Sequence, residues 1–359
     1  MLKRRQFLGS MAAASVVAAS AVVHGSTPKP FDITSDTAAD LKWRCDTIQT
    51  VGQAPRNRAP VVTGISLDGN GNQLAVVGDD HFVSIYNFED RRFTHFLAEH
   101  EDWVRAAQFQ PNGSQFTSVG NDRRILVWDS SSWSRPTELA RHPAAIINAA
   151  YSPDGTKLAT VGFEQTARIY DIQSQVLERP LECACDDNHA VAFSADSKRV
   201  AIGGRCGTIR VWDVASADMI AEYKAHRQRV RSVRFIADGH VISCSDDQSI
   251  RIVHPDRTDL VESMPRESAK QFDILMLDSE TFASARSDNR IAIWNLARKE
   301  QIGILQGHTG TVTCLAADSN RLVSGSYDTQ VRVWHRQVHA GFPQPRQTQA
   351  NDGWNQKLK

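Results

Sequence analysis

Residues 123–129 read RRILVWD, and this string decides the fold because it is one of a series. Each member is an apolar run that ends in an aromatic or bulky residue followed by a polar one. The penultimate residues of the seven members are Tyr86, Trp128, Tyr170, Trp212, Val253, Trp294 and Trp334. Successive members lie 42, 42, 42, 41, 41 and 40 residues apart. A nearly constant period of this length indicates a repeat protein in which each period folds as one unit.

Each period contains four segments that favour β-strands. In the third period, the alternating run INAAYS (147–152) precedes a turn at 153–155, a second run KLATVG (157–162) and a third run ending at Tyr170. Asp and Gly in such turns supply backbone-bonding side chains and positive φ. A further run between periods, such as TELA (137–140), supplies a fourth strand. The sequence therefore predicts an all-β, seven-bladed β-propeller with four antiparallel strands per blade.

The repeated strings resemble those of the WD-repeat family over roughly residues 47–338. The resemblance implies that each blade buries a hydrogen-bonded tetrad of His, Ser or Thr, Asp and Trp with a structural role. Some blades match the tetrad fully and others only in part. The matching residues are Asp80 and Tyr86 in the first blade; His100, Ser118, Asp122 and Trp128 in the second; His142, Thr160, Glu164 and Tyr170 in the third; His226, Ser243 and Asp247 in the fifth; Ser284, Asp288 and Trp294 in the sixth; and His308, Ser324, Asp328 and Trp334 in the seventh.

The ring must close, because an open last blade leaves an unpaired strand edge. The seventh period ends near His335 without an outer strand, and Thr47–Val51 (TIQTV) precedes the first complete period. We therefore expect Thr47–Val51 to complete the seventh blade. The domain organisation that we expect is a signal peptide at 1–26, a linker at 27–46, the propeller at 47–338 and a polar C-terminal tail at 339–359.

The N-terminus is typical of an export signal. A basic start at 3–5 precedes an apolar run from about Met11 to Val23 and then small residues. The apolar run is too short for a comfortable transmembrane helix. A resemblance to the bacterial twin-arginine translocation signal rests on Arg4, Arg5, Phe7 and Leu8. It implies folding before export, cleavage near Ala21 and a periplasmic protein; the alternative is an uncleaved anchor or a coincidental basic start.

The composition gives no sign of a polyanionic partner. Lys plus Arg and Asp plus Glu number 41 each, so the chain has no general attraction to nucleic acid or to an anionic membrane. We expect no nucleic-acid partner and, if the signal is cleaved, no stable membrane span. A hydrophobic content of 41% and a charged content of 23% are those of a globular protein with a sizeable core.

The recurrence of His, Ser and Asp together invites a hydrolase interpretation. The set recurs in several blades at one spacing, however, as a structural network does, and the sequence has no Gly-x-Ser-x-Gly nucleophile turn. The tetrad histidines lie one per blade, and no close His or Cys pair has zinc spacing. No Gly-rich phosphate loop leads from a strand into a helix. We therefore expect no catalytic residue, no metal and no cofactor.

The fourth period has exchanged most of its polar tetrad for other residues. Ala184 occupies the His position between Cys183 and Cys185, while Ile202 and Cys206 occupy the Ser and Asp positions. Since His and Asp meet in the family's network, the resemblance implies that Cys206 lies near the 183–185 segment. Because an exported chain can keep disulfides, we hypothesise that Cys206 bonds Cys185, or else Cys183. The alternative is that these small residues are buried without a bond.

The resemblance also implies a contact surface. In WD-repeat proteins it is usually the face that carries the loops leading into each inner strand and the tight turns before each third strand. The residues carried over to that face are Trp103, Arg105, Phe163, Arg205, Arg229, Arg231 and Tyr327. Exposed Trp, Tyr and Arg often dominate interface energy, and an acidic or C-terminal segment of a partner would suit them. The alternative is that these arginines are solvated loop side chains paired with Asp187 and Asp246.

These features favour a non-enzymatic, exported and monomeric scaffold that binds protein partners through its loop face. The alternatives are a propeller enzyme or a small-ligand sensor with a site at the central pore. The inward candidates for such a site are Asp187, His189 and Asp273, which are scattered along the sequence. Because a fold does not fix a function, family analogy carries most of this assignment.

Overall fold

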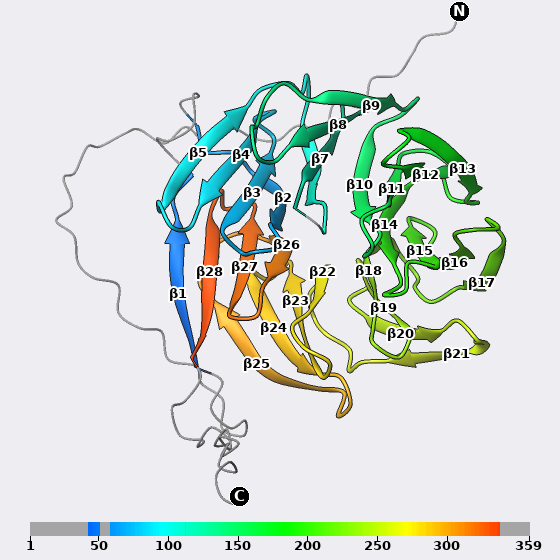
Figure 1. Cartoon of the computed structure of the whole chain (residues 1–359). Coiled ribbons are helices and arrows are strands. Elements are labelled where there is room, and N and C mark those ends of the chain that lie inside the picture. Colours follow the sequence, from blue (N-terminus) through cyan, green and yellow to red (C-terminus); the bar gives the residue numbers. More distant parts are fainter. Residues whose placement is uncertain (1–41, 51–57, 112, 338–359) are drawn as a thin grey trace, which may run out of the picture. The chain divides into compact units, whose positions relative to one another are not determined.

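The structure is a computed structural model that describes residues 42–50, 58–111 and 113–337. Contacts group the chain into residues 1–32 and 33–359, and all described residues belong to the second unit. Their regular secondary structure consists of 28 β-strands in seven four-stranded sheets (Figure 1). The predicted all-β, seven-bladed propeller with four antiparallel strands per blade is confirmed. The expected signal at 1–26 and tail at 339–359 lie outside the described residues.

Each of the first six blades uses four consecutive strands. Blades one to three are formed by β2 (Val62–Leu67), β3 (Gln73–Gly78), β4 (Val83–Asn87) and β5 (Arg92–Leu97); β6 (Val104–Phe109), β7 (Gln115–Gly120), β8 (Arg124–Asp129) and β9 (Thr137–Arg141); and β10 (Ile146–Tyr151), β11 (Lys157–Gly162), β12 (Thr166–Asp171) and β13 (Val176–Glu182). Blades four to six are formed by β14 (Asn188–Phe193), β15 (Arg199–Gly204), β16 (Ile209–Asp213) and β17 (Met219–Tyr223); β18 (Val230–Phe235), β19 (Val241–Ser245), β20 (Ile250–His254) and β21 (Arg257–Ser263); and β22 (Gln271–Met276), β23 (Thr281–Arg286), β24 (Arg290–Asn295) and β25 (Glu300–Gln306).

The seventh blade joins the two ends of the described chain. It contains β26 (Val312–Ala317), β27 (Arg321–Ser326) and β28 (Val331–Gln337), and its outer strand is β1 (Lys42–Ile48). Figure 1 shows β1, in blue, lying beside β28, in orange. The seven first strands, β2, β6, β10, β14, β18, β22 and β26, contact each other in that order, and β26 also contacts β2. These inner strands therefore form a closed ring.

The closing strand differs in position from the one predicted. It runs over Lys42–Ile48, antiparallel to β28, and thus begins five residues before Thr47, inside the segment expected to be linker. Its exposed charges Arg44 and Asp46 alternate with Trp43 and Cys45, which pack against a core cluster. An outer strand with one solvent face has this mixed pattern of exposed and packed residues. Val51, the other end of the predicted strand, lies outside the described residues.

The core lies between neighbouring blades. One cluster, for example, joins Val83 and Ile85 of blade one to Phe116, Leu126 and Trp128 of blade two. The second strand of a blade is buried over nearly its whole length, because sheets cover both of its faces. This packing explains why runs such as QLAVVG and QFTSVG are almost continuously apolar. It also gives the loops at the strand ends a rigid support.

Candidate functional site

Every inner strand carries a β-bulge at its second residue. In β14, Asn188 pairs with Gly204 and Ala190 with Gly203, so that His189 is the extra residue. The register shifts in the same place in the other six inner strands. A bulge redirects the side chain of its extra residue. We call the seven extra residues the bulge ring; they are Thr63, Arg105, Ile147, His189, Arg231, Phe272 and Thr313.

Arg231, a charged residue of the bulge ring, is paired with the carboxylate of Asp246. Its Nε and Nη2 donate to the two carboxylate oxygens of Asp246 at 2.9 and 3.0 Å. Its guanidinium carbon lies 4.8 Å from the centre of the Phe272 ring, and Phe272 meets Tyr327 edge to face at 6.3 Å. Two parallel charge-assisted hydrogen bonds fix the guanidinium strongly. Side chains of blades five, six and seven are thereby held together at this end of the ring.

Three polar side chains meet beside the bulge in blade four. Arg229 Nη2 donates to Asp187 Oδ2 at 2.6 Å, and His189 Nδ1 lies 3.5 Å from Asp187 Oδ1. The side chains of Asp187 and His189 are only 9 and 10% exposed. Asp187 Oδ1, His189 Nδ1 and Arg229 Nε are buried atoms without a hydrogen-bond partner in the described part of the chain. Because unpaired buried polar groups are costly, their concentration in one place marks a candidate ligand site.

His189 is an uncharged imidazole at neutral pH. Burial lowers its pKa to about 3, assisted by the positive charges of Arg229, Arg231 and Arg105 and opposed by Asp246. Arg105 belongs to blade two and the other two arginines to blade five, so all three guanidinium groups act on the same imidazole. Protonation of His189 would create a positive charge that is both desolvated and repelled by these arginines. At the end of the inner strands that carries the bulge ring, which we call the pore end, burial and the nearby arginines therefore keep His189 neutral.

This low pKa predicts a loss of stability in mild acid. The unfolded chain binds a proton at His189 below about pH 6.5, whereas the folded chain does so only near pH 3, so acid favours unfolding within that window. From pH 7.5 to pH 5, His189 alone is expected to cost on the order of 2 kcal/mol. We expect His189→Gln to remove this part of the pH dependence in urea unfolding, while the exposed His95→Gln leaves it unchanged. Equal slopes for wild type and His189→Gln would contradict the assignment.

Arg105 differs from the other two arginines because its hydrogen-bond partner is neutral. Its Nε donates to the side-chain oxygen of Asn121 at 2.7 Å, and its guanidinium carbon lies 4.8 Å from the centre of the Trp103 ring. No carboxylate in the described part of the chain lies within ion-pair distance of Arg105. Burial lowers the pKa of Arg105, and the weaker effects of Tyr327 and Asp102 oppose this. Arg105 is thus a partly desolvated cation without a matched anion.

The structure brings most of the predicted contact residues to one end of the ring. Trp103, Phe163 and Tyr327 are 39, 45 and 50% exposed, and Phe163 packs against His189 with ring centres 5.9 Å apart. Two of the arginines have the ion pairs that the alternative interpretation names, Arg229 with Asp187 and Arg231 with Asp246, but both side chains are largely buried. Arg205 is exposed in the turn after β15. The contact residues predicted from the sequence did not include Phe272, although its spacing from the other bulge residues follows the repeat period.

The tetrads of blades two and seven form complete hydrogen-bonded networks. In blade two, His100 Nδ1 lies 2.8 Å from Asp122 Oδ2, its Nε2 lies 2.8 Å from Ser118 Oγ, and Trp128 Nε1 donates to the same Oγ at 2.9 Å. Blade seven repeats the arrangement with distances of 2.9, 2.8 and 2.9 Å; its members are His308, Asp328, Ser324 and Trp334. Buried and internally satisfied, these groups have a structural role.

Two further blades keep the histidine and change its partners. In blade three, His142 Nδ1 lies 2.7 Å from Glu164 Oε1, while Nε2 lies 2.9 Å from the Tyr170 hydroxyl and 3.4 Å from Thr160 Oγ1. In blade five, His226 Nε2 lies 2.8 Å from Ser243 Oγ and Nδ1 lies 3.3 Å from both oxygens of Asp247. Ser249 adds a 3.0 Å contact to His226 Nδ1. Each network remains centred on one buried imidazole.

Blade six has Glu267 at the histidine position and a buried arginine that pairs with it and with the tetrad Asp. Arg286, whose side chain is 5% exposed, contacts Glu267 and Asp288 at 2.8 Å each. Trp294 Nε1 still donates to Ser284 Oγ at 3.0 Å. The sequence argument placed the last three tetrad members but missed Arg286, which stands where other blades have Gly or Ser. The network is therefore ionic rather than imidazole-based in this blade.

Blade four has a covalent link where other blades have the His–Asp contact. A disulfide joins Cys185 and Cys206, whose Cα atoms are 6.0 Å apart, while Cys183 is a buried free thiol. Arg210 Nη1 lies 3.9 Å from both sulfur atoms. Gly207 follows Cys206 with a φ of 76°, a conformation that a non-glycine residue adopts only with strain. In blade two, the corresponding turn residue Arg123 is followed by Arg124, whose N–H donates to Asp122.

The three inward candidates for a pore-site enzyme are not all brought together. Asp187 and His189 are neighbours, but Asp273 bonds Ser232 Oγ, Leu315 N and Arg234 Nη2 at 2.8, 3.0 and 3.3 Å and so ties blades five, six and seven. Within the described ranges, no group of three or more His, Cys, Asp or Glu side chains could hold a metal ion. No helix capable of spanning a membrane occurs in those ranges either.

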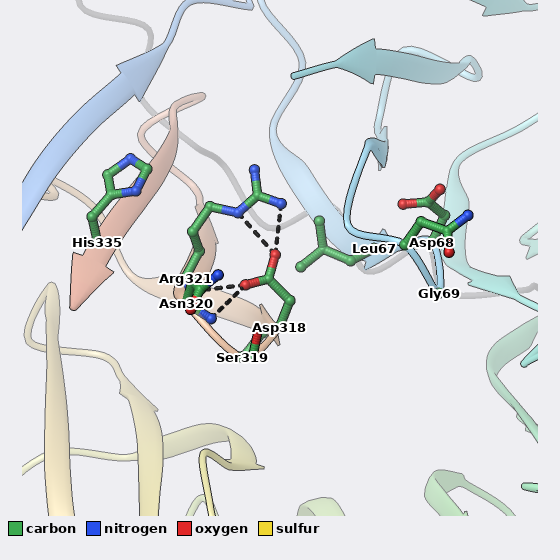
Figure 2. Close-up of a pocket in the computed structure, with 10 residues that line it drawn as sticks. Leu67, Asp68, Gly69, Asp318, Ser319, Asn320, Arg321 and His335 are labelled. Atoms are coloured by element: carbon green, nitrogen blue, oxygen red, sulfur yellow. Dashed lines mark hydrogen bonds and ion pairs between the residues drawn. The ribbon is translucent and has the colours of Figure 1, made fainter. Parts of the chain in front are cut away.

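A pocket of about 690 Å³ lies at the other end of the inner strands, between blades one and seven. It is lined by the β2–β3 turn around Asp68 and by the β26–β27 turn at 318–320. Figure 2 shows Arg321 turned towards Asp318, to which it donates from Nε and Nη2 at 2.8 and 2.6 Å. Because Asp318 already neutralises Arg321, this arginine presents no free positive charge to a ligand.

The sequence matches the WD40 family model, described as WD domain, G-beta repeat, at residues 91–129, 133–171, 186–213, 217–254 and 299–335. These matches cover half of the chain. Similar curated proteins include Mitochondrial division protein 1 of Mycosarcoma maydis and of Schizosaccharomyces pombe, 39 and 38% identical over 54 and 55 residues. WD repeat-containing protein WDS homolog of Arabidopsis thaliana is 36% identical over 61 residues. The aligned stretches cover 15, 15 and 16% of this chain and only 7, 8 and 12% of the relatives' lengths.

Proposed function

This chain belongs to the WD40 family, and from that premise we propose that it is a non-enzymatic scaffold that binds protein partners. The proposed contact surface is the end of the propeller that carries the bulge ring and the turns around it. The residues proposed for contact are Trp103, Arg105, Phe163, Arg205, Arg229, Arg231 and Tyr327.

The observation that carries the proposal is the exposure of three aromatic side chains around the bulge ring. Trp103, Phe163 and Tyr327 come from blades two, three and seven, and each keeps at least 39% of its surface open. Large aromatic side chains exposed beside arginines are the residues that most often dominate protein interfaces. The rigid propeller beneath them limits the entropy lost on binding, because the strands that carry the turns are already ordered.

Export to the periplasm is part of the proposal. It is supported by the paired Arg4 and Arg5 with Phe7 and Leu8, and by the apolar run that follows them. The Cys185–Cys206 disulfide supports it independently, since disulfides persist mainly in oxidising compartments. We further propose that the mature protein is a monomer, because the ring is closed by its own strand β1.

A catalytic role is set aside for two reasons. The histidines of the complete tetrads are buried and hydrogen-bonded on both ring nitrogens, so they lack a free position for a substrate. The pore-end pair Asp187 and His189 has no third titratable partner in Asp273, which is engaged between three blades. Hydrolysis by a nucleophile, a base and an orienting acid needs all three in contact.

The combined variant Trp103→Ala, Phe163→Ala, Tyr327→Ala tests the proposed surface. We expect it to reduce capture of cross-linked envelope proteins by at least tenfold, because it removes the large exposed anchors. Its melting temperature is expected to stay close to that of the wild type, since the three side chains are exposed. The measurement is affinity capture from the native cell envelope with quantitative mass spectrometry.

A matched control is available on the outer strands. Leu177 and Met219 are 40 and 53% exposed in β13 and β17, away from the bulge ring. Leu177→Ala with Met219→Ala is expected to leave capture unchanged. Loss of capture in this control, or full capture by the aromatic variant, would place the interface elsewhere.

A further inference from the structure

We propose that the bulge ring binds a carboxylate group of a partner's polypeptide and that Arg105 is the residue that anchors it. This inference rests on the proposed function and specifies the chemistry that the partner brings. The contact would be made at the pore end of the inner strands, among Arg105, His189 and Arg229.

The first argument is the imbalance of charge among three arginines. Arg229 and Arg231 each have a carboxylate partner, Asp187 and Asp246, at 2.6 and 2.9 Å. Arg105 has a neutral amide partner and no ion pair with the described residues. A desolvated guanidinium without a counter-ion is unfavourable, and a planar carboxylate matches its fork of N–H donors. One carboxylate from outside would complete the third pair.

The second argument is that the unsatisfied atoms of Asp187, His189 and Arg229 match a peptide better than a free anion. Arg105 also acts electrostatically on the imidazole of His189. Arg229 Nε is a donor, and its hydrogen needs an acceptor such as a carboxylate or carbonyl oxygen. Asp187 Oδ1 is an acceptor, and it needs an N–H. A simple anion has no N–H to give, whereas a peptide supplies both backbone amides and a carboxylate. The unpaired His189 Nδ1 can take either role because the imidazole is neutral.

The third argument is that Arg105 is held in position without a ligand. Asn121 fixes Nε at 2.7 Å, and the Trp103 ring covers one face of the guanidinium at 4.8 Å. Little side-chain entropy is therefore left to lose when a carboxylate binds. The exposed Trp103 ring can contact the apolar part of the same peptide segment.

The test uses three hexapeptides labelled with an uncharged BODIPY dye, which brings no carboxylate of its own, and fluorescence polarisation on the full-length protein. Hexaglutamate with an amidated C-terminus carries only side-chain carboxylates, hexaglutamine with a free C-terminus carries only the terminal one, and amidated hexaglutamine carries none. We expect one of the first two to bind saturably and amidated hexaglutamine to bind at least tenfold more weakly. The peptide that binds identifies whether the partner offers an acidic side chain or a chain end. Equal binding of all three, or of none, overturns the proposal.

The anchoring role is tested with Arg105→Gln, which keeps a donor for Asn121 and a side chain against Trp103. We expect it to weaken the preferred peptide at least tenfold, as is usual for loss of a charge-assisted pair. Arg179→Gln is the matched control, because Arg179 is exposed on β13 and donates only to the carbonyl of Ser216. Unchanged affinity in Arg105→Gln, or an equal loss in Arg179→Gln, overturns the assignment.

A measurement on the unmutated protein removes dependence on how well Arg105→Gln folds. Phenylglyoxal modifies accessible arginines, and peptide mapping reports the extent at each one. The preferred hexapeptide is expected to protect Arg105 at least fivefold and to leave Arg179 unprotected. If the aromatic variant loses envelope capture while Arg105 is neither protected nor needed, the scaffold function stands and the carboxylate site is wrong.

Discussion

Deletion of residues 1–49 is expected to abolish cooperative unfolding of the propeller, whereas deletion of residues 1–41 leaves it intact. The two deletions differ by β1 and Gln49. β1 supplies the outer strand of blade seven and pairs with β28 from Lys42↔Gln337 to Ile48↔Val331. We expect the longer deletion to cost at least about 5 kcal/mol, which is comparable to the total stability of many domains.

The size of this effect follows from what β1 covers. Ile48 is 6% exposed, and Trp43 and Cys45 pack against the cluster that contains Trp334. Without β1, one edge of β28 would present unpaired N–H and C=O groups to solvent and to other chains. Both burial and backbone pairing would be lost in the same blade.

Differential scanning calorimetry and size-exclusion chromatography of the two deletions check this expectation. The 1–41 deletion should give one sharp transition and a monomer peak. The 1–49 deletion should give a broad or absent transition and aggregates. A sharp transition at the same temperature in both proteins would mean that β1 adds little to the ring.

Reduction of the Cys185–Cys206 disulfide is expected to lower the free energy of unfolding by about 3 kcal/mol, given the 21-residue separation of the two cysteines. Cross-linking lowers the entropy of the unfolded chain, and here it also replaces the His–Asp contact that holds the same turn in other blades. Once the disulfide is reduced, blade four has no tetrad network that could hold this turn, because Ala184 and Ile202 stand at the His and Ser positions.

The double variant Cys185→Ala, Cys206→Ala tests this. Its urea unfolding curve should match that of the reduced wild type and should not respond to reductant. Cys183→Ala serves as the control, because Cys183 is a buried free thiol in the same segment. It is expected to keep the full response to reductant. Identical wild-type curves with and without reductant would show that the bond adds no stability.

The architecture could be predicted because the repeat period constrains it heavily. A spacing of 40 to 42 residues between strings such as RRILVWD leaves room for four short strands and little else. The period aligns Cys206 and Ala184 with the tetrad Asp and His, and the resemblance to WD-repeat proteins, in which those two meet, implies that Cys206 lies near the 183–185 segment; the structure has the disulfide to Cys185. The closing strand was misplaced because it stands outside the period and has no repeat partner to fix its register.

The candidate site could be predicted only in outline. The period identifies Arg105, His189 and Arg231 as equivalent positions, but their partners come from turns whose lengths and side-chain directions the sequence does not give. The sequence therefore leaves Arg229 either as a partner contact or as a solvated loop side chain paired with Asp187, and the structure contains the ion pair with Asp187. The bulges themselves depend on backbone register, which alternation of apolar residues does not reveal. Arg286 was missed because it occupies a position held by small residues in other blades.

The pairing of β1 with β28 also determines when the protein can finish folding. The two strands are separated by nearly the whole propeller sequence, so their contact has a very high sequence separation and closes the largest loop in the domain. At ribosomal rates of about 5 to 20 residues per second, β28 is synthesised roughly 15 to 60 s after β1. Until then Trp43 lacks the residues of blades six and seven that it packs against. A nascent chain that stalls before Val331 therefore carries a strand awaiting its neighbour, which makes it a natural client for chaperones.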